Sequence, residues 1–332
     1  MAAESLARDL SGKNALITGG AGFVGSNLAD AIVDYLDHLV ILDNMATGSL
    51  ENVENLLDNN REKVTLMQKD VRSYEDCLKA TKDVDVIFHL AAQINPTKAV
   101  DDPIYDFEVN ARGTLNILEA ARKNRVTKLV YASTNVYGNP KYLPIDEDHP
   151  MDLLSPYAAS KLAGEAYAIV YHNTYGVKTV RLRLSNIYGP RQTTKSGSGA
   201  VAIFTERVLR GQPPIIFGDG DQTRDFVYVT DVVKALIKAS VVPGAEGEVF
   251  NIGSGVETTI KDLARAILKI TKELVGKEPD TKLLHSPQRS ADFRRAQIDI
   301  SKANKTLGYS PAIMFEEGLR ETVKWHLLSA TT

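Results

Sequence analysis

Cysteine is almost absent from this chain of 332 residues, which contains only Cys77. A single cysteine excludes an internal disulfide and a cysteine-rich metal cluster, and it is typical of a reducing compartment. We therefore expect a cytoplasmic location and no metal site. Cys77 lies in a helical-looking stretch over residues 74–80, and we interpret it as an ordinary small apolar residue.

The chain also lacks an excess of positive charge and any long apolar run. Lys and Arg number 39 against 42 Asp and Glu, so nothing favours a nucleic-acid partner. No apolar segment approaches the ~20 residues that span a bilayer. The first dozen residues include Glu4, Arg8 and Asp9 and have no apolar core, so we expect no signal peptide. The expected partners include neither nucleic acid nor membrane.

The first half of the chain alternates short apolar runs with helical patterns. Expected strands cover residues 14–18, 39–42, 64–68, 84–90, 129–133 and 179–184. Expected helices include residues 24–35, 104–123 and 157–175. Strands that alternate with helices predict βαβ units and a parallel sheet covered on both faces, and uninterrupted apolar strands fit such a sheet. The predicted fold is α/β, with a Rossmann-type doubly wound parallel sheet.

Beyond Asn186 the alternation is interrupted by a polar, glycine-rich segment over residues 189–199 and by turns at 212–214 and 218–220. One more buried strand is expected over 247–253. Helices are expected over 260–274 and 316–327, around a polar segment at 288–300. We predict an NAD-binding domain of residues 1–185 with a return segment at about 222–253. Residues 186–221 and 254–332 are expected to form a smaller mixed α/β substrate domain over the carboxyl edge of the sheet.

A glycine turn with the spacing G-x-x-G-x-x-G follows the first strand, at Gly19, Gly22 and Gly25. Glycines permit the tight turn, let the backbone approach a pyrophosphate and let the next helix pack closely on the strand. The N-terminus of that helix, which opens with Phe23 and Val24, faces the phosphates. The turn therefore predicts a dinucleotide site.

Acidic residues end the next two expected strands. Asp43, roughly 20 residues past the turn, is placed to bind the adenosine ribose hydroxyls and repel a 2′-phosphate, which favours NAD over NADP. Asp70 either binds the adenine edge or caps the following helix. Asn110 interrupts an amphipathic pattern, and we expect it to bond backbone rather than a ligand. Further residues expected at the cofactor are Asn44, Thr47, Gly48, Val71, Leu90, Ala91 and Ala92.

A second chemical signal lies further along the chain. Ser155 and Pro156 predict the start of a helix, on which Tyr157 and Lys161 share one face. A phenol with a pKa of about 10 is a poor base at neutral pH. A neighbouring ammonium group and the positive end of the helix favour the phenolate, and an oxidised nicotinamide would add further positive charge. The spacing alone is a weak signal, but with a dinucleotide site upstream it indicates a redox centre.

These motifs occur in one order along the chain: the glycine turn, Asp43, Asp70, residues 90–92, Ser133, and the Tyr157–Lys161 pair. Together they resemble the extended short-chain dehydrogenase/reductase family, and more closely its NAD-dependent nucleotide-sugar epimerases and dehydratases. The resemblance covers about residues 14–325. It implies NAD as cofactor, a nucleotide-diphosphate sugar as substrate, and a homodimer formed through the expected helices 104–123 and 157–175.

The resemblance also implies which residues contact the substrate. Residues matching Asn186, Arg224 and Arg289 hold the diphosphate in the family, and guanidinium groups suit phosphate oxygens. The full set expected at the substrate is Gln93, Ser133, Thr134, Asn135, Asn186, Ala200, Val201, Phe217, Arg224, Arg289 and Asp292.

The segment Ser133-Thr134-Asn135 distinguishes the reactions of this family. Sugar 4,6-dehydratases carry Thr-Asp-Glu there, because two carboxyl groups move protons while water is eliminated. Decarboxylases usually keep a Glu at the last position. A 4-epimerase needs neither acid, so the resemblance implies a UDP-glucose 4-epimerase-like enzyme. Tyr157 would take the proton of the sugar 4′-hydroxyl, Ser133 would hold that oxygen, and Lys161 would lower the phenol pKa while hydride passes to NAD and returns.

Departures from the family pattern leave alternatives open. Thr97 and Ala99 stand where many relatives have an Arg and a Ser that contact the sugar or diphosphate. Ala296 stands where bulky side chains narrow the hexose pocket, so N-acetylated sugars are also candidates. The alternatives are a 4,6-dehydratase, a decarboxylase, a UDP-glucuronate 4-epimerase and a CDP-sugar 2-epimerase. A non-catalytic NAD-binding protein is a further class, but such proteins typically lose the Tyr or the Lys.

Overall fold

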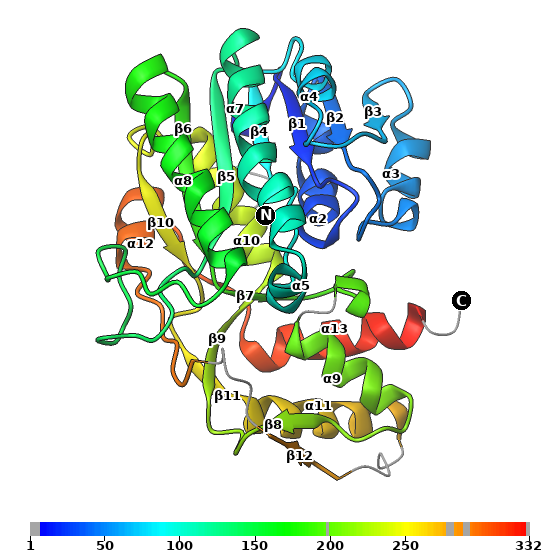
Figure 1. The fold of residues 1–332 in the computed structure, drawn as a ribbon. Helices are drawn as coiled ribbons and strands as arrows, with labels where there is room; N and C mark the ends of the chain where they lie inside the picture. The colour runs from blue at the N-terminus through cyan, green and yellow to red at the C-terminus, as the bar shows by residue number, and fades with distance from the viewer. Residues whose placement is uncertain (1–6, 197–198, 277–281, 288–292, 330–332) are drawn as a thin grey trace.

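The computed structural model describes residues 7–196, 199–276, 282–287 and 293–329 (Figure 1). Its largest element is a seven-stranded sheet with the order β10-β6-β5-β4-β1-β2-β3, in which every pairing is parallel. The strands are β1 (Asn14–Thr18), β2 (His38–Leu42), β3 (Val64–Met67), β4 (Val86–His89), β5 (Lys128–Thr134), β6 (Lys178–Leu184) and β10 (Val249–Ile252). Each overlaps an expected strand, and the predicted doubly wound fold is confirmed.

Helices cover both faces of this sheet (Figure 1). α2 (Phe23–Ile32) and α10 (Val229–Val241) lie on one face, and α4 (Tyr74–Ala80), α7 (Gly113–Lys123) and α8 (Pro156–Tyr175) lie on the other. The shorter helices of this part are α3 (Glu54–Asn59), α5 (Pro96–Asp101), α6 (Pro103–Phe107) and α12 (Ser301–Leu307). Short 3-10 turns occur at Arg8–Leu10, Val33–Tyr35, Leu50–Asn52 and Thr194–Ser196. In the part of the chain that the structure describes, no helix has the length and apolar character to cross a membrane.

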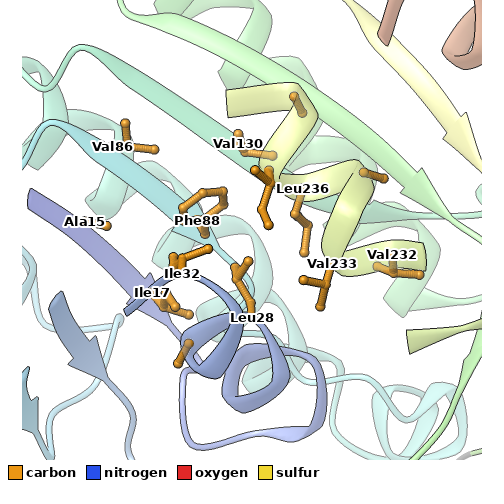
Figure 2. Packing of buried hydrophobic residues seen from close by; sticks show 14 of the residues in the cluster. Ala15, Ile17, Leu28, Ile32, Val86, Phe88, Val130, Val232, Val233 and Leu236 are labelled. Carbon is orange, nitrogen blue, oxygen red and sulfur yellow. The ribbon is translucent and has the colours of Figure 1, made fainter. Parts of the chain in front are cut away.

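Two apolar cores follow from the period-two alternation of the strands. In β4, Phe88 faces the core beneath α2 and α10, whereas Ile87 faces the core beneath α7 and α8. Figure 2 shows Phe88 among side chains of the first core, including Leu28 and Leu236 from the two helices. Cys77 belongs to the second core, where burial raises the pKa of its thiol to about 12. The interpretation of Cys77 as an apolar core residue is confirmed.

The expected single helix over residues 104–123 is interrupted. α6 is followed by a π-helical turn at Glu108–Arg112, and α7 begins only at Gly113. Inside this wider turn, Asn110 is buried, and its side chain bonds the backbone of Gln93 in the loop after β4. Its Oδ1 accepts from the Gln93 N–H at 2.8 Å, and its Nδ2 donates to the Gln93 carbonyl at 2.9 Å. The expectation that Asn110 bonds backbone is confirmed.

A second group of elements begins where β6 ends. β7 (Asn186–Tyr188), β9 (Thr223–Tyr228) and β11 (Glu257–Thr259) form a three-stranded sheet, and β8 (Ile215–Phe217) pairs with β12 (Leu284–Ser286). α9 (Ala200–Leu209), α11 (Ile260–Val275) and α13 (Phe315–Ser329) supply a third core, and Figure 1 shows them stacked below the main sheet.

The expected return segment 222–253 is divided between the two groups. β9 joins the three-stranded sheet, whereas α10 and β10 complete the layers of the main sheet. The structure therefore assigns each element of this segment to a sheet or core, and the domain limits themselves stay a prediction.

Phe88 supplies a direct test of the first core. Phe88→Ala leaves a cavity between β4 and the two helices that pack on it, so the free energy of unfolding should fall by about 3–5 kcal/mol. Urea denaturation followed by circular dichroism measures this change. Met314→Ala is the control, because Met314 is exposed and its truncation should change stability by less than about 0.5 kcal/mol. A loss below about 1 kcal/mol for Phe88→Ala would contradict this packing.

Candidate active site

The strand order of the main sheet reverses between β1 and β4, and ligands of such sheets bind at the carboxyl ends of the strands at this point. The loops after the two strands are in contact here. Gly19 has a φ of +70°, and a β-carbon on it would lie 2.9 Å from the backbone nitrogen of Ala91. Leu90 and Ala91 both donate backbone N–H groups to the Thr18 hydroxyl at 3.1 Å. Glycine is thus required at position 19 for the two loops to meet.

The N-terminus of α2 points into this junction and fits a pyrophosphate. Gly22 is the N-cap residue, and among the described residues no side chain bonds the free N–H groups of the first turn, which contains Phe23 and Val24. A β-carbon on Gly25 would clash with the Gly19 carbonyl oxygen, so the helix packs directly on the turn. Free helical N–H groups beside a glycine turn form an anion site.

Asp43 fixes the glycine turn to the end of β2. Its Oδ2 accepts from the Ala21 N–H at 3.0 Å, and its Oδ1 accepts from the Met45 N–H at 2.8 Å. Burial raises the pKa of Asp43, and these two hydrogen bonds oppose the rise. Thr47 and Gly48 follow in the same loop, and Gly48 packs against the Asp43 carboxylate. This loop surrounds the carboxylate that we expect at the adenosine ribose.

Asp70 does not cap the helix that follows it. The cap of α4 is Ser73, whose hydroxyl accepts from the Asp76 N–H at 3.3 Å, so the capping alternative for Asp70 is wrong. Asp70 instead accepts from Asn44 Nδ2 at 2.8 Å and pairs with Arg72 at 2.8 Å. Burial alone would raise the pKa of Asp70, but the bonds from Arg72 and Asn44 bring it below its usual value. Asp70 and Asn44 therefore act as one polar unit beside Val71.

Lys161 lies in the interior, between α8 and β5. α8 begins at Pro156 with Ser155 as its cap, as predicted. The Lys161 Nζ donates to the Ala132 carbonyl at 2.7 Å and lies 4.4 Å from the centre of the Tyr131 ring. Burial lowers the pKa of Lys161 to about 7, although nearby carboxylates oppose the change. The ammonium form is therefore only marginally held at neutral pH.

Tyr157 is half-buried one helical turn before Lys161. Burial raises the pKa of Tyr157 to about 12, and a hydrogen bond with the Thr134 side chain lowers it. The protein groups alone therefore leave the phenol protonated at neutral pH. The further positive charge that we expect from a bound oxidised nicotinamide would favour the phenolate.

Ser133 makes a contact that sequence reasoning missed. Its hydroxyl donates to Glu165 Oε1 at 2.5 Å, and Glu165 pairs with Arg183 at 2.8 Å. Both partners of this ion pair are almost fully buried. Glu165 lies four residues beyond Lys161 and so on the same helix face, which is the signal that could have indicated it. The Tyr157 side chain is hydrogen-bonded to that of the residue after Ser133, Thr134.

The residues expected at the substrate are only partly brought together. Gln93 is nearly buried, and its Nε2 donates to the Asn95 carbonyl at 3.0 Å and to Asp106 at 2.9 Å. Asn135 accepts from the Tyr137 N–H at 3.4 Å, close to Ser133 and Thr134 in the chain. Gln93 is thus turned into the protein.

Asn186 and Arg224 lie in the same small sheet, because β7 pairs with β9 and aligns Asn186 with Phe226. Asn186 is exposed, whereas the buried Arg224 donates to the carbonyls of Thr223 at 2.6 Å and Phe293 at 3.0 Å. The guanidinium carbon of Arg224 lies 3.9 Å from the centre of the Phe293 ring. These contacts hold Arg224 against the protein.

The remaining residues expected at the substrate lie at the ends of helices and strands or outside the residues that the structure describes. Ala200 and Val201 open α9, and Phe217 ends β8. Arg289 and Asp292 lie outside the described residues.

The glycine turn and the N-terminus of α2 form a site that fits a dinucleotide. With Tyr157 and the buried Lys161 on one face of α8, this site is typical of a nicotinamide-dependent enzyme. The family profile described as GDP-mannose 4,6 dehydratase matches residues 16–322. A UDP-glucose 4-epimerase of Mycolicibacterium smegmatis is 41% identical over 313 residues, which are 93% of this chain and 97% of that protein. A Methanocaldococcus jannaschii protein, provisionally named UDP-glucose 4-epimerase, is 42% identical over the same shares.

Solved structures agree with this relationship. The UDP-glucose 4-epimerase of Thermotoga maritima, solved with UDP-glucose, superposes with a TM-score of 0.88 at 35% identity, covering 96% of this chain and 99% of that one. Other relatives, at 32–34% identity, are named as UDP-glucuronic acid decarboxylases and dTDP-glucose 4,6-dehydratases. The chain therefore belongs to the extended short-chain dehydrogenase/reductase family of NAD-dependent nucleotide-sugar epimerases and dehydratases.

Gly25→Ala tests the pyrophosphate site that the glycine turn and the N-terminus of α2 form. The added β-carbon meets the Gly19 carbonyl and pushes α2 away from the turn, at a cost of about 1–3 kcal/mol. NAD should then bind roughly 10- to 100-fold more weakly. Isothermal titration calorimetry with NAD on protein stripped of cofactor measures the change. Gly276→Ala is the control: its φ of +72° makes that substitution strained too, but at the end of α11, so it should leave NAD binding unchanged. Unchanged NAD binding in Gly25→Ala would argue against this site for the pyrophosphate.

Proposed function

We propose that this protein is an NAD-dependent nucleotide-sugar 4-epimerase that interconverts UDP-glucose and UDP-galactose through a 4-keto intermediate. The observation that carries the proposal is the pair Thr134 and Asn135, which occupies the positions where a dehydratase has two acids, with Thr134 hydrogen-bonded to the Tyr157 side chain. Neither a hydroxyl nor an amide exchanges a proton with a sugar carbon at neutral pH. The names of the relatives at 41–42% identity support the same reaction.

In the proposed reaction, Tyr157 accepts the proton of the sugar 4′-hydroxyl and returns it at the end of the cycle. Lys161 favours the phenolate through its charge, and Thr134 does so through its hydrogen bond to the same oxygen. Ser133 holds the substrate oxygen, for which its hydroxyl proton turns from Glu165 toward the sugar. NAD⁺, held by the glycine turn and Asp43, would supply the acceptor for the C4′ hydride and, once reduced, the donor that returns it to the other face of the 4-keto sugar.

The other expected residues bind and orient in this proposal. The backbone of the glycine turn and the N-terminus of α2 hold the pyrophosphate of NAD, while Asp43 binds the adenosine ribose and Asp70 the adenine edge. Asn186, Arg224 and Arg289 hold the diphosphate of the sugar nucleotide while the hexose turns over.

We also propose that the enzyme is a cytoplasmic homodimer. The face of α6 and α8 that points away from the sheet exposes Ile104, Phe107, Ile169 and Val170, and exposed apolar groups of this kind are typical of subunit interfaces. The apolar residues Ile117 and Leu118 of α7, in contrast, are buried against the sheet. The single cysteine supports a reducing compartment.

The product formed from UDP-glucose tests the reaction. Purified protein should convert UDP-glucose to UDP-galactose without added NAD, because the cofactor is regenerated in each cycle. Tyr157→Phe should lower kcat by roughly 100-fold or more while NAD stays bound, since the proton acceptor is lost. Chromatography of the sugar nucleotides measures both. A 4-keto-6-deoxy sugar as the product would make the protein a dehydratase, and release of carbon dioxide from UDP-glucuronate would make it a decarboxylase.

Ala296 leads to a prediction about substrate range. Because Ala296 is small where restrictive 4-epimerases carry a bulky side chain, the enzyme should turn over UDP-N-acetylglucosamine as well as UDP-glucose. Ala296→Leu should lower kcat/KM for the acetylated sugar by about tenfold or more while changing that for UDP-glucose less. Rates on the two sugars are compared side by side, with thermal melting as the control for folding because Ala296 is buried. No turnover of the acetylated sugar by the unmodified enzyme would contradict this prediction.

A further inference from the structure

A buried ion pair lies against Ser133, and the reaction proposed above assigns it no role. Glu165 of α8 and Arg183 of β6 are both almost fully buried. Ser133 and Arg183 are aligned partners in the parallel pairing of β5 with β6, so their side chains leave the sheet on one face, where they meet Glu165. Because a buried ion pair is weak evidence for stability alone, its contact with Ser133 needs a physical explanation.

Arg183 satisfies the Glu165 carboxylate without help from Ser133. The Arg183 Nε donates to Oε1 at 3.0 Å, and its Nη2 donates to Oε2 at 2.8 Å. Its Nη1 donates to the Tyr137 hydroxyl at 2.8 Å and to the Glu147 carbonyl at 3.1 Å, so the guanidinium is held from two sides. A guanidinium keeps its proton in proteins, and the carboxylate beside it only accepts hydrogen bonds. Both oxygens of Glu165 are therefore bonded whether or not Ser133 donates to them.

The Ser133 hydroxyl, in contrast, relies on Glu165. Ser133 is almost fully buried, and its Oγ donates to Glu165 Oε1 at 2.5 Å. A buried hydroxyl that loses its acceptor is destabilising, so this bond fixes the side chain. Since Glu165 only accepts, the proton of the bond belongs to Ser133. Rotation about the Cβ–Oγ bond can turn that proton away from Glu165 while the oxygen stays in place.

We infer that Glu165 is a positioning residue for the redox step: it fixes the Ser133 oxygen and accepts the Ser133 hydrogen bond whenever no sugar oxygen does so. The inference rests on the proposed function insofar as Ser133 holds the sugar oxygen. It goes further, because it assigns the control of that hydroxyl to a carboxylate whose own charge is kept paired by Arg183.

The proposed reaction needs an exchange of this kind. The sugar oxygen has to leave Ser133 while the hexose turns over, and at that moment the buried hydroxyl needs another acceptor. Glu165 is that acceptor, and Arg183 keeps Glu165 bonded when the hydroxyl turns back to the sugar. Ser133 can therefore release the sugar oxygen and bind it again without moving its own oxygen.

The experiment is a double-mutant cycle of Glu165→Gln and Ser133→Ala in the NAD-loaded enzyme. Glu165→Gln exchanges a charge-assisted bond for a neutral one, so kcat with UDP-glucose should fall by about tenfold. In Ser133→Ala protein the same substitution should change kcat by less than about twofold, because no hydroxyl is left to position. Glu165→Asp, which keeps the charge and shortens the side chain by one methylene group, should show the same dependence on Ser133. It carries the cycle if circular dichroism shows that Glu165→Gln does not fold.

Glu119→Gln is the matched control. Glu119 also pairs with an arginine, Arg122, and also accepts from a hydroxyl, that of Tyr171. Its substitution should leave kcat unchanged with and without the Ser133 hydroxyl. If Glu165→Gln instead lowers kcat by one factor in both backgrounds, the ion pair only holds α8 on the sheet, and the inference is overturned.

A second measurement does not depend on turnover. Urea denaturation of the same four proteins gives the coupling between Ser133 and Glu165 in the unfolding equilibrium constant, and a charge-assisted bond predicts a coupling of about tenfold or more. Additive effects would mean that Glu165 does not hold the hydroxyl, which also overturns the inference.

A third measurement separates the inference from the proposed function. The reduction of bound NAD is followed by near-ultraviolet absorbance after mixing with UDP-glucose or UDP-glucuronate. If the rate of reduction shows the expected dependence on Ser133 but no UDP-galactose is formed, the proposed 4-epimerase function fails and the inference about Glu165 stands. Bound NAD that neither sugar nucleotide reduces would overturn both.

Discussion

The burial of the Lys161 ammonium between β5 and α8 is the constraint that the rest of the site depends on. A buried charge without compensation costs several kcal/mol, so the surrounding chain must supply partners. The Ala132 carbonyl and the Tyr131 ring do so directly. The ring fits there only because Gly164 has no side chain, since a β-carbon would clash with the Tyr131 hydroxyl. A glycine in the middle of a long helix, otherwise unfavourable, is thus explained by the cation one turn earlier.

A polar network connects β5, which carries Ser133, to residues far along the chain. The Glu165–Arg183 pair beside Ser133 continues through Arg183 Nη1, which donates to the Tyr137 hydroxyl at 2.8 Å. Tyr137 then donates to Asn251 Oδ1 at 2.6 Å, and Asn251 Nδ2 donates to the Ile145 carbonyl at 3.0 Å. Ile145 forms a parallel bridge with Ile298, two residues beyond Ala296. One path of hydrogen bonds therefore joins the end of β5 to the segment that carries Ala296.

Local features of the sequence were sufficient for the seven strands, the glycine turn and the Tyr157–Lys161 face, because each depends on residues close together in the chain. The polar network could not be predicted in this way. Ser160 and Asp106 are 54 residues apart, and Tyr137 and Asn251 are 114 apart, so their pairing exists only after the sheet has formed. The strands β7, β8, β11 and β12, of three residues each, were missed because they are too short for a periodic pattern. The longer β9 (Thr223–Tyr228) was missed as well. The π-helical turn was missed as well, and its Asn110 bonds Gln93, 17 residues earlier, which no local pattern indicates.

The network also bears on the proposal that a redox step at this site is reversed and does not lead to elimination. Two carboxylates lie near the reacting pair, but Asp106 is 0% exposed and Glu165 is 1% exposed, and the oxygens of both are bonded within the protein. Neither is available to remove a proton from a sugar carbon. Thr134, which bonds the Tyr157 side chain, carries a hydroxyl, and its neighbour in the chain, Asn135, carries an amide. Neither Thr134 nor Asn135 is an acid that could protonate a leaving hydroxyl, which supports the proposed return of the hydride.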